Sequence, residues 1–109
     1  MEVRIYKDSK GTIHGFQVSG HSELGPAGSD VLCSAVSALT ITTVNAIETF
    51  TKDPVDVEAV NEAEGFLHFR LKKVSKESKL LLDALVLGLK DVQRSYDRYL
   101  SIIEEEVKC

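Results

Sequence analysis

Apolar residues at every second position open the chain and predict a β-hairpin. The alternation runs from residue 1 to residue 6, and a period of two is typical of a strand with one buried face. Polar residues and a glycine at 7–11 supply a turn, and a second predicted strand covers residues 12–19. Gly15, inside this second strand, indicates a bulge or a close approach by another backbone.

From about residue 30 to residue 50 the apolar side chains recur every three or four positions, which predicts an amphipathic helix. The stripe consists of Leu32, Ala35, Val36, Leu39, Thr43, Ala46, Ile47 and Phe50. Cys33 lies about 100° round the helix from Leu32 and therefore at the border of the stripe. This spacing fits a packed thiol as well as a thiol half-exposed in a cleft.

A second alternating pair follows the helix. Lys52, Asp53 and Pro54 end the helix. The alternation at residues 55–59 and 66–72 predicts a third and a fourth strand that pair antiparallel to each other.

Ser75 is the predicted N-cap of a final helical region that extends to Ile103. Its length of about 30 residues exceeds a typical globular helix, and whether Gly88 divides it into two stays open. The stretch 80–89 is apolar on nearly every side, so it is either sandwiched in the core or shared with a second subunit. Glu104–Glu106 oppose the helix macrodipole and predict a frayed, solvated tail.

The element order β-β-α-β-β-α predicts an α+β fold of two layers, in which an antiparallel sheet packs on helices. A chain of 109 residues is long enough for one domain. No linker rich in proline and serine divides it, so we expect a single domain over residues 1–109.

The charge balance bears on the partners. The formal net charge is -4 and no basic run is longer than Lys72-Lys73. We therefore expect no direct contact with nucleic acid, whose phosphates need clustered cations. A mildly acidic surface instead suits a basic polypeptide partner.

Cysteine and histidine usage gives no sign of a metal site. Cys33 and Cys109 form no CxxC pair, and the histidines at 14, 21 and 68 lack the spacing of zinc ligands. We therefore expect no metal and no cofactor, and an incidental thiol at the C-terminal residue. No signal peptide and no apolar run of membrane-spanning length are evident, so we expect a cytoplasmic protein that contacts no membrane and keeps its thiol reduced.

The candidate chemistry lies in residues 20–37, GHSELGPAGSDVLCSAVS. Cys33 falls about one turn into a helix that Ser29 or Asp30 would cap, and unpaired N–H groups at a helix start lower thiol pKa values. His21 precedes it by twelve residues, with glycines between that let the chain fold back. A cysteine and a histidine are the minimum for nucleophilic acyl chemistry.

The same stretch resembles the ribosomal-processing cysteine proteases of bacteria, which trim the N-terminal extension from a large-subunit ribosomal protein. His21, Asp30 and Cys33 match the family's histidine, aspartate and cysteine with the same separations. The likeness covers nearly the full length in pattern, and its specific part is 20–45. Ser22 and the serine after Cys33 stand where the family commonly has alanine, which leaves the substrate fit open.

The resemblance implies roles for these residues. His21 takes the thiol proton, Cys33 attacks a backbone carbonyl, and N–H groups at the helix start stabilise the oxyanion. Asp30 either orients His21 or caps the helix, and the residues leave both roles open. A loop between the histidine and the aspartate is expected to bind substrate; it consists of Ser22, Glu23, Leu24, Gly25, Pro26, Ala27, Gly28 and Ser29.

The partners that the resemblance implies are a ribosomal protein precursor as substrate and a second copy of the chain in a homodimer. The alternative function is a noncatalytic, ribosome-associated module that binds a basic ribosomal protein. A thiol redox protein is disfavoured because no resolving cysteine lies near Cys33.

Overall fold

The described part of the chain forms two helices and a five-stranded sheet. The computed structural model describes residues 1–20, 26–61 and 66–107, without the side chains of 26–30 and 58–61. Its elements are β1 (Glu2–Lys7), β2 (Ile13–Ser19), α1 (Pro26–Phe50), β3 (Val55–Asn61), β4 (Phe66–Leu71), α2 (Lys76–Ser95) and β5 (Ser101–Glu106).

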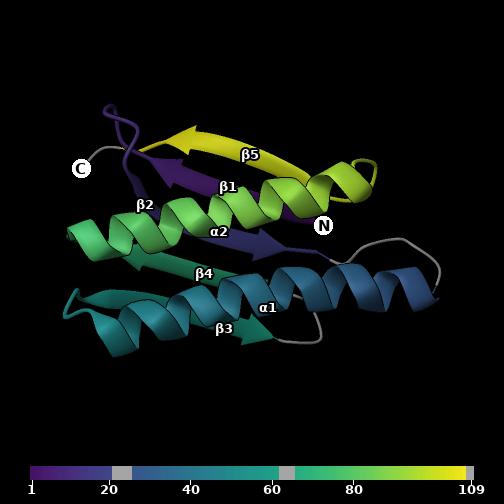
Figure 1. Cartoon of the computed structure of the whole chain (residues 1–109), viewed down its shortest axis with the longest axis horizontal. Coiled ribbons are helices and arrows are strands. Elements are labelled where there is room, and N and C mark those ends of the chain that lie inside the picture. Colours follow the sequence, from purple (N-terminus) through teal and green to yellow (C-terminus); the bar gives the residue numbers. More distant parts are fainter. Residues whose placement is uncertain (21–25, 62–65, 108–109) are drawn as a thin grey trace.

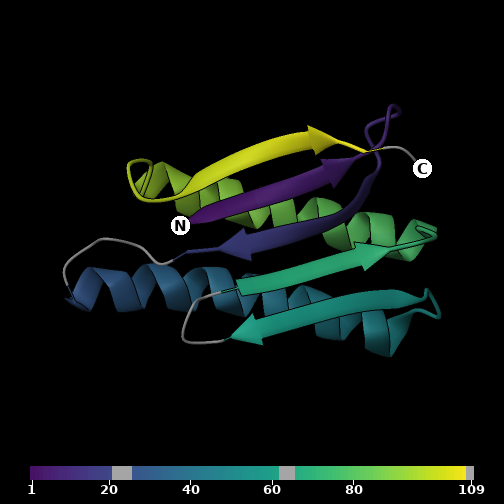
Figure 2. The ribbon, with the colours of Figure 1, turned by 180° about the vertical axis from the view of Figure 1, so that it is seen from behind.

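The elements form two layers. Both helices lie on one face of the sheet (Figure 1), and the view from behind shows that the other face has no helix on it (Figure 2). The strand order is β3-β4-β2-β1-β5. The α+β class, the two layers and the order of the first six elements confirm the prediction.

The core lies between the sheet and the helices, as the alternation predicts. Val3 and Ile5 of β1 are fully buried and pair across the ladder with Val18 and Phe16 of β2. The Phe16 ring stacks on Phe69 of β4, with ring centroids 5.4 Å apart. Burying side chains of this size contributes roughly 1.5–3 kcal/mol each.

Gly15 lies next to a strand irregularity and is also closely approached by another backbone, the two features that a glycine within a strand indicates. The β1–β2 register shifts after the pair of Tyr6 with Gly15, which produces an irregularity at His14. The His14 Nε2 atom lies 2.8 Å from an Asp8 carboxylate oxygen. A Cβ atom on Gly15 would overlap the carbonyl oxygen of Phe69, so only glycine lets β2 and β4 pair here.

Helix α1 buries the predicted stripe except at its last residue. Leu32, Val36 and Ile47 are buried, but Phe50 is 76% exposed, which corrects its assignment to the core. Thr40, which is not part of the predicted stripe, is also buried. Its hydroxyl donates to the Val36 carbonyl 2.8 Å away, so its burial leaves no unpaired polar group.

The apolar content of α1 also corrects the expectation about membrane-spanning length. Among the described residues, 31–50 form one helix that is long and apolar enough to cross a bilayer by length and composition, with a mean hydropathy of 1.5. The helix packs Leu32, Val36 and Ile47 into the core beside the sheet.

The C-terminal region differs most from the prediction. Helix α2 starts at the predicted N-cap, Ser75, whose hydroxyl accepts from the Ser78 N–H, and it continues through Gly88. It ends at Ser95 instead of Ile103. Residues 101–106 then form β5, an edge strand parallel to β1, so the sheet is mixed and Glu104–Glu106 belong to a strand.

Gly88 fixes how the two helices lie together. They run antiparallel (Figure 1), and a Cβ atom on Gly88 would lie 3.1 Å from the Leu39 Cδ2 atom. Leu39 therefore occupies the space that a side chain on α2 would fill. Because the helices are antiparallel, a residue that lies n positions before Leu39 in α1 is level with the residue n positions after Gly88 in α2. The same holds for residues after Leu39 and before Gly88.

Asp53 ties the loop after α1 to the start of α2. Its Oδ2 atom accepts hydrogen bonds from the Ser75 N–H at 2.9 Å, the Ser75 hydroxyl at 2.6 Å and the Ser78 hydroxyl at 2.5 Å. These bonds hold the pKa of the Asp53 carboxyl below its ordinary value of 3.8, and Lys73 lowers it further.

We predict that Asp53→Asn destabilises the protein by on the order of 1 kcal/mol at pH 7 and by less at pH 3. The folded-state pKa lies below the unfolded one, so the carboxylate stabilises the fold above its ordinary pKa and loses that effect as the pH falls through the folded value. Urea unfolding of both proteins at the two pH values measures the difference. Asp56→Asn, which replaces an exposed carboxylate of β3, is the control, and an Asp53 effect that does not depend on pH contradicts the assignment.

Candidate active site

One end of the molecule gathers the segments next to the predicted site residues. Strand β2 ends at Ser19, and Gly20 follows with a φ of +84°, a backbone that side-chain-bearing residues rarely adopt. The Met1 ammonium donates to the Tyr99 carbonyl at 3.0 Å. The Cα atom of Met1 would lie 3.8 Å from a Cβ on Gly20, so the chain start, the end of β2 and the turn after α2 meet here.

Cys33 lies in the first half of α1, near this same end. It is a free cysteine with a half-buried side chain, which is the second of the two alternatives that its place at the border of the apolar stripe left open. Cys33 precedes Leu39 by six residues and Arg94 follows Gly88 by six, about 9 Å along each axis. The thiol is therefore level with the end of α2.

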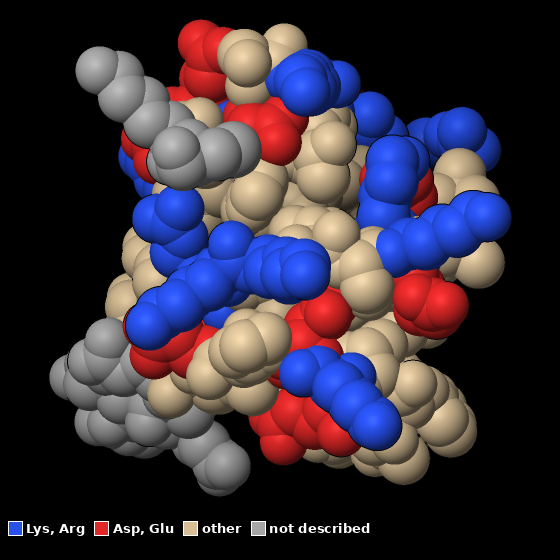
Figure 3. All heavy atoms as spheres, turned by 90° about the vertical axis from the view of Figure 1, so that its left-hand side faces the viewer, with Lys and Arg blue, Asp and Glu red and all other residues tan. Residues whose placement is uncertain are grey.

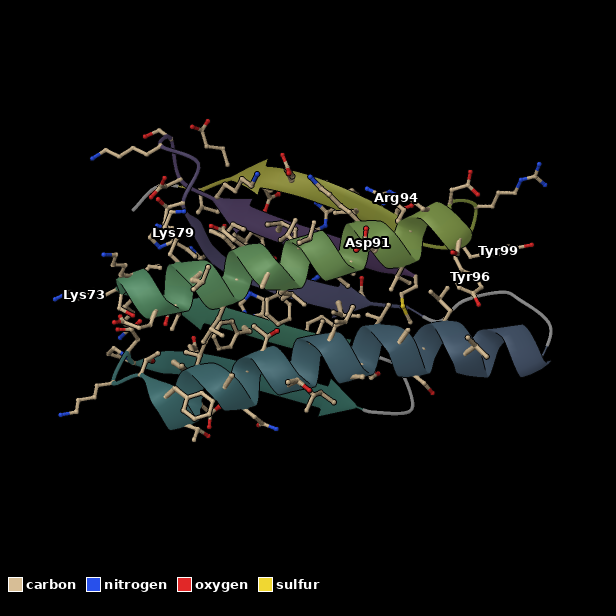
Figure 4. The ribbon with its side chains drawn as sticks, viewed as in Figure 1. Lys73, Lys79, Asp91, Arg94, Tyr96 and Tyr99 are labelled. Carbon is tan, nitrogen blue, oxygen red and sulfur yellow. The ribbon has the colours of Figure 1, made fainter. Side chains whose placement is uncertain are left out.

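Figure 4 shows Arg94, Tyr96 and Tyr99 at the end of α2 that lies beside the first half of α1. Tyr96 packs partly against the core and its N–H caps the helix by donating to the Gln93 carbonyl at 3.1 Å. The helical spacing of the sequence places both tyrosines within the final helical region, whose continuity at Gly88 it leaves open. The signal for a turn was weak because their spacing also fits a helical stripe.

The helix start lies earlier than predicted. Helix α1 begins at Pro26, so Asp30 is its fifth residue and Cys33 its eighth. The assignment of Asp30 as a helix cap is therefore wrong. The N–H of Cys33 also lies beyond the first turn, where unpaired donors and the macrodipole act, so the helix start does not supply the predicted oxyanion donors at the thiol.

The earlier helix start also shortens the predicted substrate-binding loop. Residues 26–29 of the predicted loop form the first turn of α1. His21 and residues 22–25 lie outside the described residues, and so does the side chain of Asp30. The structure therefore does not describe the contact between His21 and Cys33.

The described residues supply a nucleophile and no metal centre. Nowhere in the described ranges do three or more His, Cys, Asp or Glu side chains gather as metal ligands. A half-buried thiol at the meeting point of α1 and the end of α2 can attack an electrophile that reaches this end.

Known proteins match this chain over nearly its whole length. A family model described as Cysteine protease Prp matches residues 1–101. The ribosomal processing cysteine protease Prp of Staphylococcus aureus is 26% identical over 98 residues, which cover 87% of this chain and 90% of that protein. The protein of the same name from Bacillus subtilis is 22% identical over 101 residues, which cover 88% and 89%.

A solved structure has the same fold. It is the ribosomal processing protease Prp from S. aureus in complex with a covalently linked product peptide. The TM-score is 0.86 at 24% identity, with 95% of this chain and 98% of that chain covered. The mixed sheet with two helices on one face is therefore shared.

We predict that Gly20→Ala lowers proteolysis far more than it lowers stability. The φ of +84° costs an alanine about 1–2 kcal/mol, and relief of that strain redirects the chain where His21 begins. Gly11→Ala is a matched control, because Gly11 has a φ of +82° with nothing within 4 Å of an added Cβ and lies in the β1–β2 turn. Urea unfolding and cleavage assays compare the two variants. Equal losses of activity would show that strain alone, and not the position beside His21, matters.

Proposed function

The chain belongs to the Cysteine protease Prp family, and on that basis we propose that it removes the N-terminal extension of a large-subunit ribosomal protein during ribosome assembly. It is a cysteine protease, as the family and the relatives named ribosomal processing proteases indicate. The substrate is the proposed part. A basic ribosomal protein precursor suits a chain whose formal net charge is -4.

The observation that supports the proposal most is the position of Cys33. Its thiol is half-buried on α1 and level with the end of α2, at the end of the molecule where the chain leaves β2 through Gly20 toward His21. A nucleophile in this position can receive an extended peptide from solvent while one side of it stays packed. A purely structural cysteine has no need of this exposure.

The proposed reaction has two stages. The His21 imidazole accepts the Cys33 thiol proton, and the thiolate attacks the scissile backbone carbonyl to form a tetrahedral intermediate. Collapse breaks the C–N bond, His21 gives its proton to the leaving amine, and a thioester remains on Cys33. Water, deprotonated by His21, then hydrolyses the thioester and restores the thiol.

Asp30 is assigned to the orientation of His21. Its former alternative, the helix cap, does not fit the fifth position of α1. Asp30 and Cys33 stand three residues apart and therefore on one side of the helix. A carboxylate on that side either opposes the thiolate or stabilises the imidazolium that forms beside it, and only the second role assists the reaction.

The proposed reaction also has consequences for the location and the oligomeric state of the protein. A ribosomal substrate and a thiol that must stay reduced both favour the cytoplasm. We also expect a homodimer, because Ile41 of α1 and Leu80 and Leu87 of α2 are between 51% and 71% exposed. A groove of about 370 Å³ between the helices adds further apolar surface. The noncatalytic binding module is disfavoured by membership of a protease family.

We predict that Cys33→Ala lowers cleavage of the extended precursor by at least about 10³-fold while the fold persists. The loss of one half-buried sulfur costs little packing, on the order of 1 kcal/mol. Incubation with the precursor followed by mass spectrometry locates the cut, and thermal unfolding checks the fold. Cys109→Ser is the control with normal activity, and undiminished cleavage by the Ala variant removes Cys33 as the nucleophile.

We predict that Asp30→Asn lowers cleavage by more than about tenfold with a change in stability below about 1 kcal/mol. The amide keeps the size of the side chain but no longer stabilises an imidazolium at His21. Asp97→Asn, an exposed carboxylate in the turn after α2, is the matched control. Cleavage and unfolding are measured on the same preparations, and near-normal cleavage would reduce the site to a dyad of Cys33 and His21.

A further inference from the structure

The end of the molecule opposite to the candidate site gathers exposed lysines from three connections of the chain. They come from the β1–β2 turn, the loop after α1, and the segment that leads from β4 into α2. We call this surface the basic end, and it consists of Lys10, Lys52, Lys72, Lys73 and Lys76. Figure 3 looks onto this end, where lysine and arginine side chains extend over the surface with carboxylates between them.

These five lysines differ in their pairing from the other described lysines and arginines apart from Arg98. None of the five takes part in the ion pairs of the described residues. By contrast, Arg4, Lys90 and Arg94 each lie within 4.0 Å of a carboxylate oxygen, and Arg70 stacks on the Tyr6 ring at 5.3 Å. The ammonium groups of the basic end are therefore available to an external anion.

Two of the carboxylates at this end, Asp53 and Asp8, have partners within the protein. Asp53 accepts from Ser75 and Ser78, and Asp8 lies 2.8 Å from His14. The Asp53 bonds also fasten the loop that carries Lys52 to the segment that carries Lys72, Lys73 and Lys76. These hydrogen bonds hold the four ammonium groups near one another against their mutual repulsion.

An exposed aromatic ring completes this surface. Phe50, the last residue of α1, is 76% exposed. It follows Leu39 by eleven residues, as Glu77 precedes Gly88 by eleven, so it is level with the first turn of α2. Figure 4 shows Lys73 and Lys79 at this same end. A ring that is so exposed buries little apolar area and therefore contributes little to the stability of the fold.

We propose that the basic end binds single-stranded RNA, with the lysines on its phosphates and Phe50 stacked on a base. Ammonium groups that neutralise phosphates release counterions, and one aromatic face binds any base without sequence preference. Clustered lysines also attract an anionic membrane surface, but insertion of a ring into a bilayer gains most from apolar neighbours, and the neighbours of Phe50 in the chain are Thr49 and Thr51. An acidic peptide gains little from an exposed ring.

This proposal revises the expectation of no nucleic-acid contact. That expectation counted runs of adjacent basic residues, and the fold gathers lysines that lie far apart in the sequence. The proposal does not depend on the proteolytic function, because RNA binding is measured without any cleavage. RNA binding would attach such a protease to an RNA-rich assembly through the basic end, while the opposite end stays accessible to the peptide substrate.

The first test removes the charge of three lysines: Lys72→Gln, Lys73→Gln and Lys76→Gln. Fluorescence anisotropy with a labelled single-stranded RNA of twelve nucleotides measures the affinity of the full chain between 50 and 200 mM salt. We expect at least tenfold weaker binding and a salt slope that is smaller by about 2, since each phosphate contact on a single strand contributes about 0.7.

A matched control alters three cations at the other end of α2: Lys90→Gln, Arg94→Gln and Arg98→Gln. It changes the net charge equally, and we expect its affinity for RNA to stay within twofold of the original protein. Equal losses in the two triple variants would overturn the proposal, because the net charge alone would then govern binding. Thermal unfolding verifies that both variants fold.

The second test is Phe50→Ala, which removes the ring and keeps every charge. We expect RNA binding weaker by roughly 5- to 150-fold, the range for loss of one base–aromatic stack, with an unchanged salt slope. Undiminished affinity would remove Phe50 from the site. Absence of RNA binding by the original protein at 50 mM salt, or binding of phosphatidylserine vesicles in its place, would overturn the proposal as a whole.

Discussion

The contact of Leu39 with Gly88 fixes the register of the two helices, and the layout of the molecule depends on it. Because the Leu39 side chain fills the space above Gly88, α1 and α2 pack closely and can slide little past each other. The same contact brings Cys33 level with the end of α2 and Phe50 level with its start. Both helices lie on one face of the sheet, so the two ends of the helix pair remain accessible to solvent.

Most of the fold could be predicted because its elements carry local patterns. The period-two strands, the apolar stripe of α1 and the Ser75 cap all lie where the sequence places them. Strand β5 could not be predicted, because Leu100 and Ile103 continue a helical spacing and the glutamates have low strand propensity. Their stabilisation comes from far away in the chain, through the pairing with β1 and the Lys7–Glu104 ion pair at 2.9 Å.

The candidate site was predicted in part, and the error has a physical cause. The position of Cys33 at the border of the apolar stripe was predicted, but the helical spacing left the exposure of its side chain open. The helix start was placed four residues late because Pro26 was read as a loop residue, although proline is favoured at the first position of a helix. Two turns of helix before the thiol then weaken any effect of the macrodipole, so the reactivity of the thiol depends on the imidazole more than on the helix.

The two ends of α1 are far enough apart to act independently. Cys33 and Phe50 are separated by seventeen residues, about 25 Å of helix, in a molecule whose longest dimension is 39 Å. At physiological ionic strength a charge is screened within about 8 Å, so the lysines of the basic end have no direct electrostatic influence on a thiolate at Cys33. A polypeptide at one end and a polyanion at the other would therefore not compete, and the acidic net charge of the chain does not describe the basic end.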